Sequence, residues 1–175
     1  LLHDLTNHTQ EEVFTLVARR WNGLKRLRAN VGDGNMRYEE YGGYEIFMPE
    51  QEQLYRQCLD AIPQLNKRLK EITGIDDVYS SVDKRIKEFK FGNVSHMIWN
   101  RAEGQIDTGM MMQTLLRKVQ SMNVNVVNGV NVERFAEEGT HAEITLSEGT
   151  TIKAKKLLLA TNGFARELVP ELNVA

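Results

Sequence analysis

The hydrophobic positions between Thr9 and Ile72 recur at helical spacing. One stripe predicts an amphipathic helix between Thr9 and Gly32, and a second predicts another between Pro49 and Gly74. Thr9-Gln10-Glu11-Glu12 fits a capping box, and the helix should stop near Gly32-Asp33-Gly34, where two glycines tolerate the positive φ of a C-cap. Because Pro63 lacks an amide hydrogen, we expect a kink or a break in the second helix. The two stripes consist of Val13, Leu16, Val17, Trp21, Leu24, Leu27 and Val31, and of Leu54, Cys58, Leu59, Ile62, Leu65, Leu69 and Ile72.

Shorter apolar runs predict strands around and after these helices. Residues 36–39 and 44–48 are strand-like, with Gly42-Gly43 as the turn of a hairpin between them, and residues 94–99 predict a further strand. The mixed charges of residues 75–93 favour a short surface helix or turn.

The pattern changes after residue 107. Asp107 or Thr108 fits the N-cap of a helix that reaches Met122. Three alternating segments then predict an antiparallel meander, because turn residues with Gly139 and Gly149 separate them. The three segments are residues 130–136, 142–146 and 151–154.

Two further candidate strands flank this meander. Residues 124–127 follow the helix, and residues 157–160 are apolar at every position, as in a strand covered on both faces. We expect these runs to lie side by side in one parallel sheet, with the meander set apart at an edge. Thr161-Asn162-Gly163 then follows at the carboxyl end of a strand, where open α/β sheets bind their ligands.

Composition narrows the class of protein. The chain has 175 residues, of which 41% are hydrophobic and 26% charged, as in a globular domain rather than a disordered one. A net charge of -2 gives no basic field for nucleic acid. Cys58 is the only cysteine and forms no internal disulfide, which favours a reducing, cytoplasmic location. No apolar run approaches the roughly 18 residues of a membrane span.

Few motifs carry chemistry by themselves. The four histidines are scattered and the cysteine has no partner at ligand spacing, so we expect no metal site. There is no nucleophile elbow and no phosphate loop, and Gly32-Asp33-Gly34 lacks a third glycine at the required offset.

The order of motifs from Gly104 to Gly163 resembles one family. Gly104-Gln105-Ile106-Asp107-Thr108-Gly109, the helix, Gly129-Val130-Asn131-Val132, the meander and Leu158-Leu159-Ala160-Thr161-Asn162-Gly163 look like the D-amino-acid oxidase and glycine/sarcosine oxidase family of FAD-dependent oxidoreductases. The resemblance implies a mixed α/β and α+β fold. Residues 1–103 would form part of a helix-rich α+β substrate-domain insertion. Residues 104–175 would form part of an FAD/NAD(P)-binding-type α/β domain that includes the antiparallel meander.

The resemblance also implies which residues lie beside FAD. The backbone of Val132 would contact the adenine end, although a valine there also suits ordinary core packing. Ala160, Thr161, Asn162 and Gly163 would form the turn beside the cofactor, with Asn162 where the family more often has glycine; the alternative is an ordinary capped turn. The family's Gly-x-Gly-x-x-Gly unit would precede Leu1 and further sheet would follow Ala175. We therefore expect a fragment of a longer enzyme that is inactive alone and holds FAD weakly or not at all.

The implied activity is oxidation of the C–N bond of an amine or amino acid by hydride transfer to FAD. Tyr44 and Arg101 are candidates to grip a substrate carboxylate, since phenol and guanidinium donors suit it; a packed tyrosine and a surface arginine are the alternatives. We assign no catalytic residue, because the flavin itself carries the chemistry. The alternative function is a self-contained, non-enzymatic α+β interaction module. An exposed sheet edge would allow a homodimer.

Overall fold

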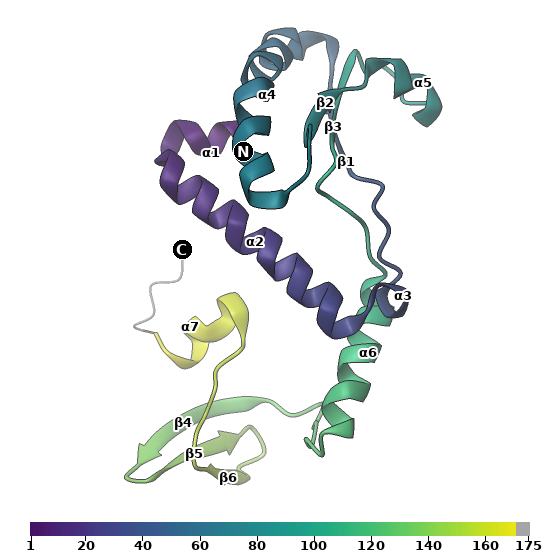
Figure 1. Ribbon diagram of the computed structural model, residues 1–175. Coiled ribbons are helices and arrows are strands. Elements are labelled where there is room, and N and C mark those ends of the chain that lie inside the picture. The colour runs from purple at the N-terminus through teal and green to yellow at the C-terminus, as the bar shows by residue number, and fades with distance from the viewer. Residues whose placement is uncertain (171–175) are drawn as a thin grey trace. The chain divides into compact units, whose positions relative to one another are not determined.

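The computed structural model describes residues 1–170, which form two compact units that divide between Met122 and Asn123. Each unit has helices and an antiparallel three-stranded sheet, so the fold is mixed α/β, as predicted. In the first unit, the long helix α2 runs from α1 to α3 (Figure 1). The helices of this unit are α1 (Leu2–Asn7), α2 (Gln10–Val31), α3 (Asp33–Met36), α4 (Glu52–Thr73), α5 (Ile86–Phe89) and α6 (Thr108–Ser121), with 3-10 turns η1 (Pro49–Gln51) and η2 (Asp83–Arg85).

The predicted caps are confirmed. The hydroxyl of Thr9 accepts a hydrogen bond from the Glu12 amide at 3.3 Å, and the Glu12 carboxylate accepts one from the Thr9 amide at 3.0 Å. Helix α2 ends at Gly32 with a φ of 87°, and α4 ends at Gly74 with a φ of 75°. At the start of α6, the Asp107 carboxylate accepts from the Met110 amide at 2.9 Å.

Of the kink or break predicted at Pro63, the break is wrong, because α4 is one helix of 22 residues with Pro63 inside it. A proline in a helix removes one donor and costs about 3 kcal/mol. Against this, α4 buries Tyr55 and Leu69, and it packs on both α2 and strand β2 (Tyr79–Ser81). Packing on two neighbours holds the helix together across the proline.

The predicted hairpin at Gly42-Gly43 is also wrong. Strand β1 (Gly43–Phe47) pairs with the distant β3 (His96–Asn100), and the sheet order is β1-β3-β2, antiparallel throughout. Residues 33–36 form α3 instead of leading into a strand, and Glu39 makes an isolated bridge to Gln105. The apolar pattern of residues 44–48 predicts a strand but does not indicate which segment pairs with it. The hydrogen-bonding partner of β1 comes from a distant part of the chain.

The core of the first unit lies between the helices and one face of this sheet. Phe47, Tyr55 and Ile98 form one buried cluster beneath α4. Phe14 on α2, Leu69 on α4 and Val78 before β2 form the second. These clusters fix both long helices to the sheet.

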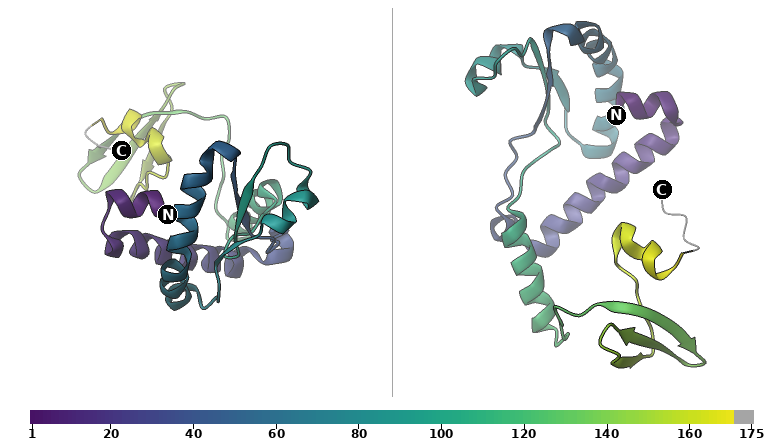
Figure 2. Two further views of the ribbon diagram at one scale, coloured as in Figure 1. Left: turned by 90° about the horizontal axis from the view of Figure 1, so that it is seen from above. Right: turned by 180° about the vertical axis from the view of Figure 1, so that it is seen from behind.

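Two extended connectors join the sheet to α3 and α6. Residues 38–42 and 101–107 run side by side (Figure 2), and Glu39 and Gln105 exchange two backbone hydrogen bonds of 3.0 Å each. The Asp107 amide donates to the Met36 carbonyl at 2.8 Å. Helix α6 packs on α3 and α2, so it lies in the first compact unit, whereas the sequence grouped it with residues 104–175.

The second unit contains the predicted meander. Strands β4 (Val132–Glu138), β5 (His141–Leu146) and β6 (Thr151–Ala154) pair in that order, antiparallel, which confirms the three predicted strands. Alternate residues of β5 are buried, namely Ala142, Ile144 and Leu146. The 3-10 turn η3 (Asn162–Phe164) leads into α7 (Ala165–Leu168), and α7 packs against β4.

The two predicted parallel strands are absent from residues 1–170. Neither 124–127 nor 157–160 is paired as a strand. Their side chains are open to solvent, with Val127 71% and Leu158 86% exposed. A strand needs hydrogen-bonded neighbours, and the described part of the chain supplies none for these two runs.

None of the helices in residues 1–170 is long and apolar enough to cross a lipid bilayer.

Candidate functional site

Val132, the first predicted cofactor residue, begins β4 at the edge of the meander sheet. Just before it, the Asn131 carbonyl accepts a hydrogen bond of 3.0 Å from the Ser147 amide. The amide of Leu146, which faces Val132 in the register, donates instead to Thr150 on the other side of β5. The register shifts between Val132 and Arg134, so a β-bulge leaves the peptide groups at this end of β4 outside the regular ladder.

This geometry fits one end of the implied cofactor. The Val132 side chain is 37% exposed, so no core of the described residues encloses it. An N–H and a C=O side by side match the acceptor and donor that an adenine edge carries. The adenine contact remains a prediction, and the backbone at Val132 is suited to it.

The second predicted group, residues 160–163, follows the apolar run. Ala160, Thr161 and Asn162 are all exposed. Asn162 has a φ of 53°, in the left-handed region where asparagine is among the few tolerated non-glycine residues. The backbone there has the conformation that glycine would adopt, so asparagine can replace glycine at this turn without changing the path of the chain.

The sequence contains no comparable binding motif for the pyrophosphate part of FAD. A dinucleotide site uses a Gly-x-Gly-x-x-Gly turn and a helix N-terminus, and residues 1–175 contain no such motif. The predicted FAD contacts in this chain are therefore limited to Val132 and the turn at residues 160–163.

Tyr44, the first candidate substrate residue, lies on β1 opposite Trp99 of β3. Its hydroxyl accepts a hydrogen bond of 2.7 Å from Nη1 of Arg85. The ring of Phe89 meets the Tyr44 ring edge-on, with centroids 4.9 Å apart. Tyr44 thus belongs to a small cluster with Arg85 and Phe89 on the sheet face opposite α4.

Arg101, the second candidate, is exposed just after β3. Its backbone amide donates to the Val78 carbonyl at 2.8 Å. No contact joins its side chain to Tyr44 in the described residues, and the guanidinium beside Tyr44 is that of Arg85. Arg85 was not predicted as a site residue, because it lies among the mixed charges of residues 75–93, which favour a short surface helix or turn.

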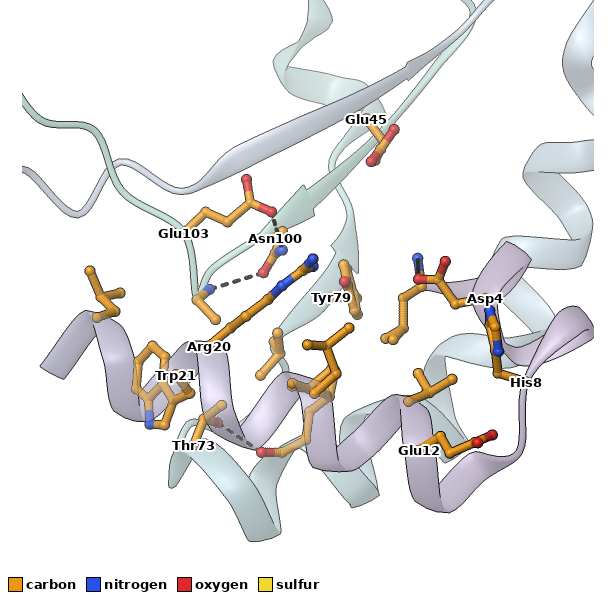
Figure 3. A pocket seen from close by; sticks show the side chains of 18 residues that line it. Asp4, His8, Glu12, Arg20, Trp21, Glu45, Thr73, Tyr79, Asn100 and Glu103 are labelled. Atoms are coloured by element: carbon orange, nitrogen blue, oxygen red, sulfur yellow. Dashed lines mark hydrogen bonds and ion pairs between the residues drawn. The ribbon is translucent and has the colours of Figure 1, made fainter. Parts of the chain in front are cut away.

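A cleft of about 610 Å³ lies between α2 and the sheet end that carries Glu45, Tyr79 and Asn100. Figure 3 shows Arg20 reaching from α2 toward Tyr79 and Asn100, with Trp21 beside it. Asn100 is fixed by two hydrogen bonds: its amide donates to Glu103 at 2.6 Å, and its oxygen accepts from the Ala102 amide at 3.1 Å. None of the site residues predicted from the sequence lines this cleft, namely Tyr44, Arg101, Val132 and residues 160–163.

Tyr79 is the one residue of the cleft whose pKa is strongly perturbed. Burial, and then the nearby carboxylates of Glu103 and Glu45, raise the pKa of Tyr79 to about 12. The phenol therefore stays protonated at neutral pH.

A third polar group surrounds His96 at the start of β3. The Nδ1 atom of His96 lies 2.7 Å from Asp83, and the Nε2 atom lies 2.7 Å from Glu52. The imidazole stacks on Tyr55 with ring centroids 3.9 Å apart. In the described part of the chain, no group of three or more histidine, cysteine or acidic residues is arranged to hold a metal ion.

Comparison with known proteins identifies the wider group. The curated protein ThiO/ThiG from Synechocystis sp., described as bifunctional, is 28% identical over 72 residues, which are 41% of this chain and 11% of that protein. The solved structure of iminodiacetate oxidase from Chelativorans sp. BNC1 matches 91% of this chain with a TM-score of 0.61 and 17% identity. Glycine oxidase from Geobacillus kaustophilus matches 90% with a TM-score of 0.61 and 16% identity.

The chain spans a minor part of each of these proteins. It covers 42% of the iminodiacetate oxidase and 41% of the glycine oxidase. At these identities, the two structures show a shared fold. The sequence itself matches the family described as FAD dependent oxidoreductase over residues 1–175, its whole length. The chain therefore belongs to the family of FAD-dependent oxidoreductases.

Proposed function

We propose that this chain is part of an enzyme that oxidises the C–N bond of an amine or amino acid by hydride transfer to FAD. The match to the family over residues 1–175 carries the proposal. The two structural neighbours support the substrate class, since one is a glycine oxidase and the other an iminodiacetate oxidase, and both compounds are amines bearing carboxylates. The match favours this function over a non-enzymatic interaction module.

The reaction would convert the amine into an imine. A hydride leaves the carbon next to nitrogen and a proton leaves the nitrogen, and water then hydrolyses the imine to a carbonyl compound and an amine or ammonia. When bound, FAD would supply the hydride acceptor. The part of this chain would be to hold the adenine end through the backbone of Val132 and to place the turn at residues 160–163 beside the cofactor.

Tyr44 remains the better of the two candidate substrate residues. Its hydroxyl accepts from Nη1 of Arg85, whose Nε donates to Glu88 at 3.0 Å, so the phenol and the remaining guanidinium N–H groups form one donor group on the sheet face opposite α4. A pair of this kind suits a substrate carboxylate. We propose Tyr44 with Arg85 in place of Tyr44 with Arg101.

The decisive experiment uses the complete gene product that contains this chain. A purified protein with a flavin visible spectrum that bleaches anaerobically on addition of glycine, iminodiacetate or another small amine would support the proposal. A correctly folded but colourless product would overturn it. Three further proposals need their own measurements: purification of the 175-residue chain alone tests that it does not retain FAD, cell fractionation tests that the enzyme is cytoplasmic, and sedimentation of the complete product tests that it dimerises through a sheet edge.

A further inference from the structure

His96 joins three elements of the first unit through its imidazole. Asp83 of η2 lies at Nδ1 and Glu52 of α4 lies at Nε2, each at 2.7 Å. Tyr55, also of α4, covers the ring face, and its hydroxyl donates to Asp83 at 3.1 Å. The His96 side chain is 24% exposed, so protons exchange with solvent while the contacts stay partly shielded.

The protonation state of His96 decides how many of these contacts can exist. A carboxylate only accepts hydrogen bonds, and a neutral imidazole has one N–H donor. Both contacts at 2.7 Å are therefore hydrogen bonds only when the ring is an imidazolium. Loss of the proton leaves one lone pair facing a carboxylate oxygen, and that contact must open.

The surroundings select which contact opens. Asp83 is held independently of His96, because it accepts from the Met97 amide at 2.8 Å and from the Tyr55 hydroxyl. Glu52 has one other partner, Arg56, on the same helix at 2.7 Å. The Glu52 side chain is also the more exposed of the two, at 44% against 35%. The neutral ring therefore keeps its Nδ1 hydrogen for Asp83 and loses Glu52.

We propose that His96 is a proton-operated clamp on the first turn of α4, which ties Glu52 to the sheet when protonated and releases it when neutral, while Asp83 stays bound. This device is independent of the flavin chemistry proposed above. It makes the local order of residues 49–56 depend on pH.

The electrostatic surroundings agree with the direction of the effect. The hydrogen bond to Asp83 raises the pKa of His96 above its usual value, burial opposes this rise, and Glu52 adds to it. The charged and titratable groups that meet the cluster are Asp83 from η2 and Glu52, Tyr55 and Arg56 from α4. Because the folded pKa is raised, the stabilisation is fully present below the unfolded pKa of about 6.5 and is lost as pH rises through the folded value.

The test combines titration with hydrogen exchange on the 175-residue protein. NMR of the His96 ring should give a pKa above the ordinary value, with the Nδ1–H tautomer after deprotonation. Between about pH 6 and pH 9, protection factors of amides 56–58, whose acceptors lie in the first turn of α4, should fall several-fold. The Met97 amide, which donates to Asp83, should keep its protection.

Variants separate the clamp from general pH sensitivity. Glu52→Gln should lower the His96 pKa and flatten the pH dependence at amides 56–58, because a glutamine amide can donate to the neutral ring. His96→Gln should flatten it as well, whereas His8→Gln, at an exposed histidine, should leave it unchanged. The proposal would be overturned if the Met97 amide loses protection instead of amides 56–58. It would also be overturned if the pH dependence at amides 56–58 is unchanged in Glu52→Gln, and both outcomes can be read even if His96→Gln fails to fold.

Discussion

The indole Nε1 of Trp99 donates a hydrogen bond of 3.0 Å to the backbone carbonyl of Tyr41, across the close approach of β3 to Gly42. Gly42 has a φ of 77°, and a Cβ at this position would overlap the Trp99 indole and lie 2.7 Å from the Asn100 carbonyl oxygen. The glycine is thus required both by backbone conformation and by space.

Gly42→Ala should destabilise the protein by about 1–3 kcal/mol, from the strained φ and the displaced indole. Gly23→Ala is the matched control. Gly23 lies inside α2, and a Cβ there meets nothing within 4 Å. Removing a helix glycine should stabilise by about 0.5–1 kcal/mol. Urea unfolding followed by circular dichroism measures both, and equal effects of the two variants would contradict this account.

The capping box at Thr9 gives a second prediction. Thr9→Ala removes the acceptor of the Glu12 amide and should cost about 1 kcal/mol of unfolding free energy. Thr9→Ser should keep most of the cap, and Thr15→Ala, at an exposed position inside α2, should change stability little. A Thr15→Ala loss as large as that of Thr9→Ala would show that the cap is not the cause.

The same cap should respond to acid. The side-chain and backbone hydrogen bonds of Thr9 lower the pKa of Glu12 below its usual value. A lowered folded pKa gives stabilisation that is present above the unfolded pKa and is lost as pH falls through the folded value. The difference in melting temperature between Thr9→Ala and the parent protein should therefore shrink in acid. A constant difference down to about pH 2 would contradict the pairing.

The core between the two long helices gives the fourth prediction. Leu69 is 3% exposed and packs with Phe14 of α2 and Val78. Leu69→Ala should leave a cavity and cost about 2–5 kcal/mol. Leu54→Ala on the same helix, where the side chain is 45% exposed, should cost about 0.5 kcal/mol or less. Thermal and urea unfolding of the pair distinguish burial from helix propensity, since both replace leucine by alanine in α4.

Local sequence signals predicted the elements whose hydrogen bonds are local. The two 22-residue helices, their caps at Thr9 and Gly74, and the meander satisfy their backbones within themselves or with the next strand. Periodicity and turn residues therefore sufficed for them. The predicted hairpin failed because the partner of β1 is β3, about 50 residues away. Nothing in residues 36–48 alone encodes that pairing.

The residues of the candidate site also divide into those whose conformation is set locally and those whose partners are distant in the sequence. The conformation at Asn162 agrees with the residue type, since asparagine tolerates a positive φ. The pairing of Tyr44 with Arg85 depends on η2 and α5 folding back beside β1, and a basic run with mixed charges carries no sign of it. The runs 124–127 and 157–160 have the composition of buried strands, but a composition does not supply the neighbouring strands.

The last prediction concerns the proposed adenine contact at Val132. If the backbone makes this contact, Val132→Ala should bind FAD as the parent does, because the peptide groups remain. Val132→Pro removes the N–H and should weaken FAD binding by the loss of a hydrogen bond, about 1 kcal/mol or more. Proline is tolerated on an edge strand where the N–H faces outward, so β4 should still form.

The measurement is titration of the apo form of the complete gene product with FAD, followed by flavin fluorescence, with circular dichroism as the check on folding. Weak binding by the folded Val132→Pro variant together with normal binding by Val132→Ala would assign the contact to the backbone. Normal binding by both would remove Val132 from the cofactor site. Weak binding by both would place the side chain, and not the peptide groups, against the cofactor, because alanine keeps the N–H and C=O that the edge of β4 presents.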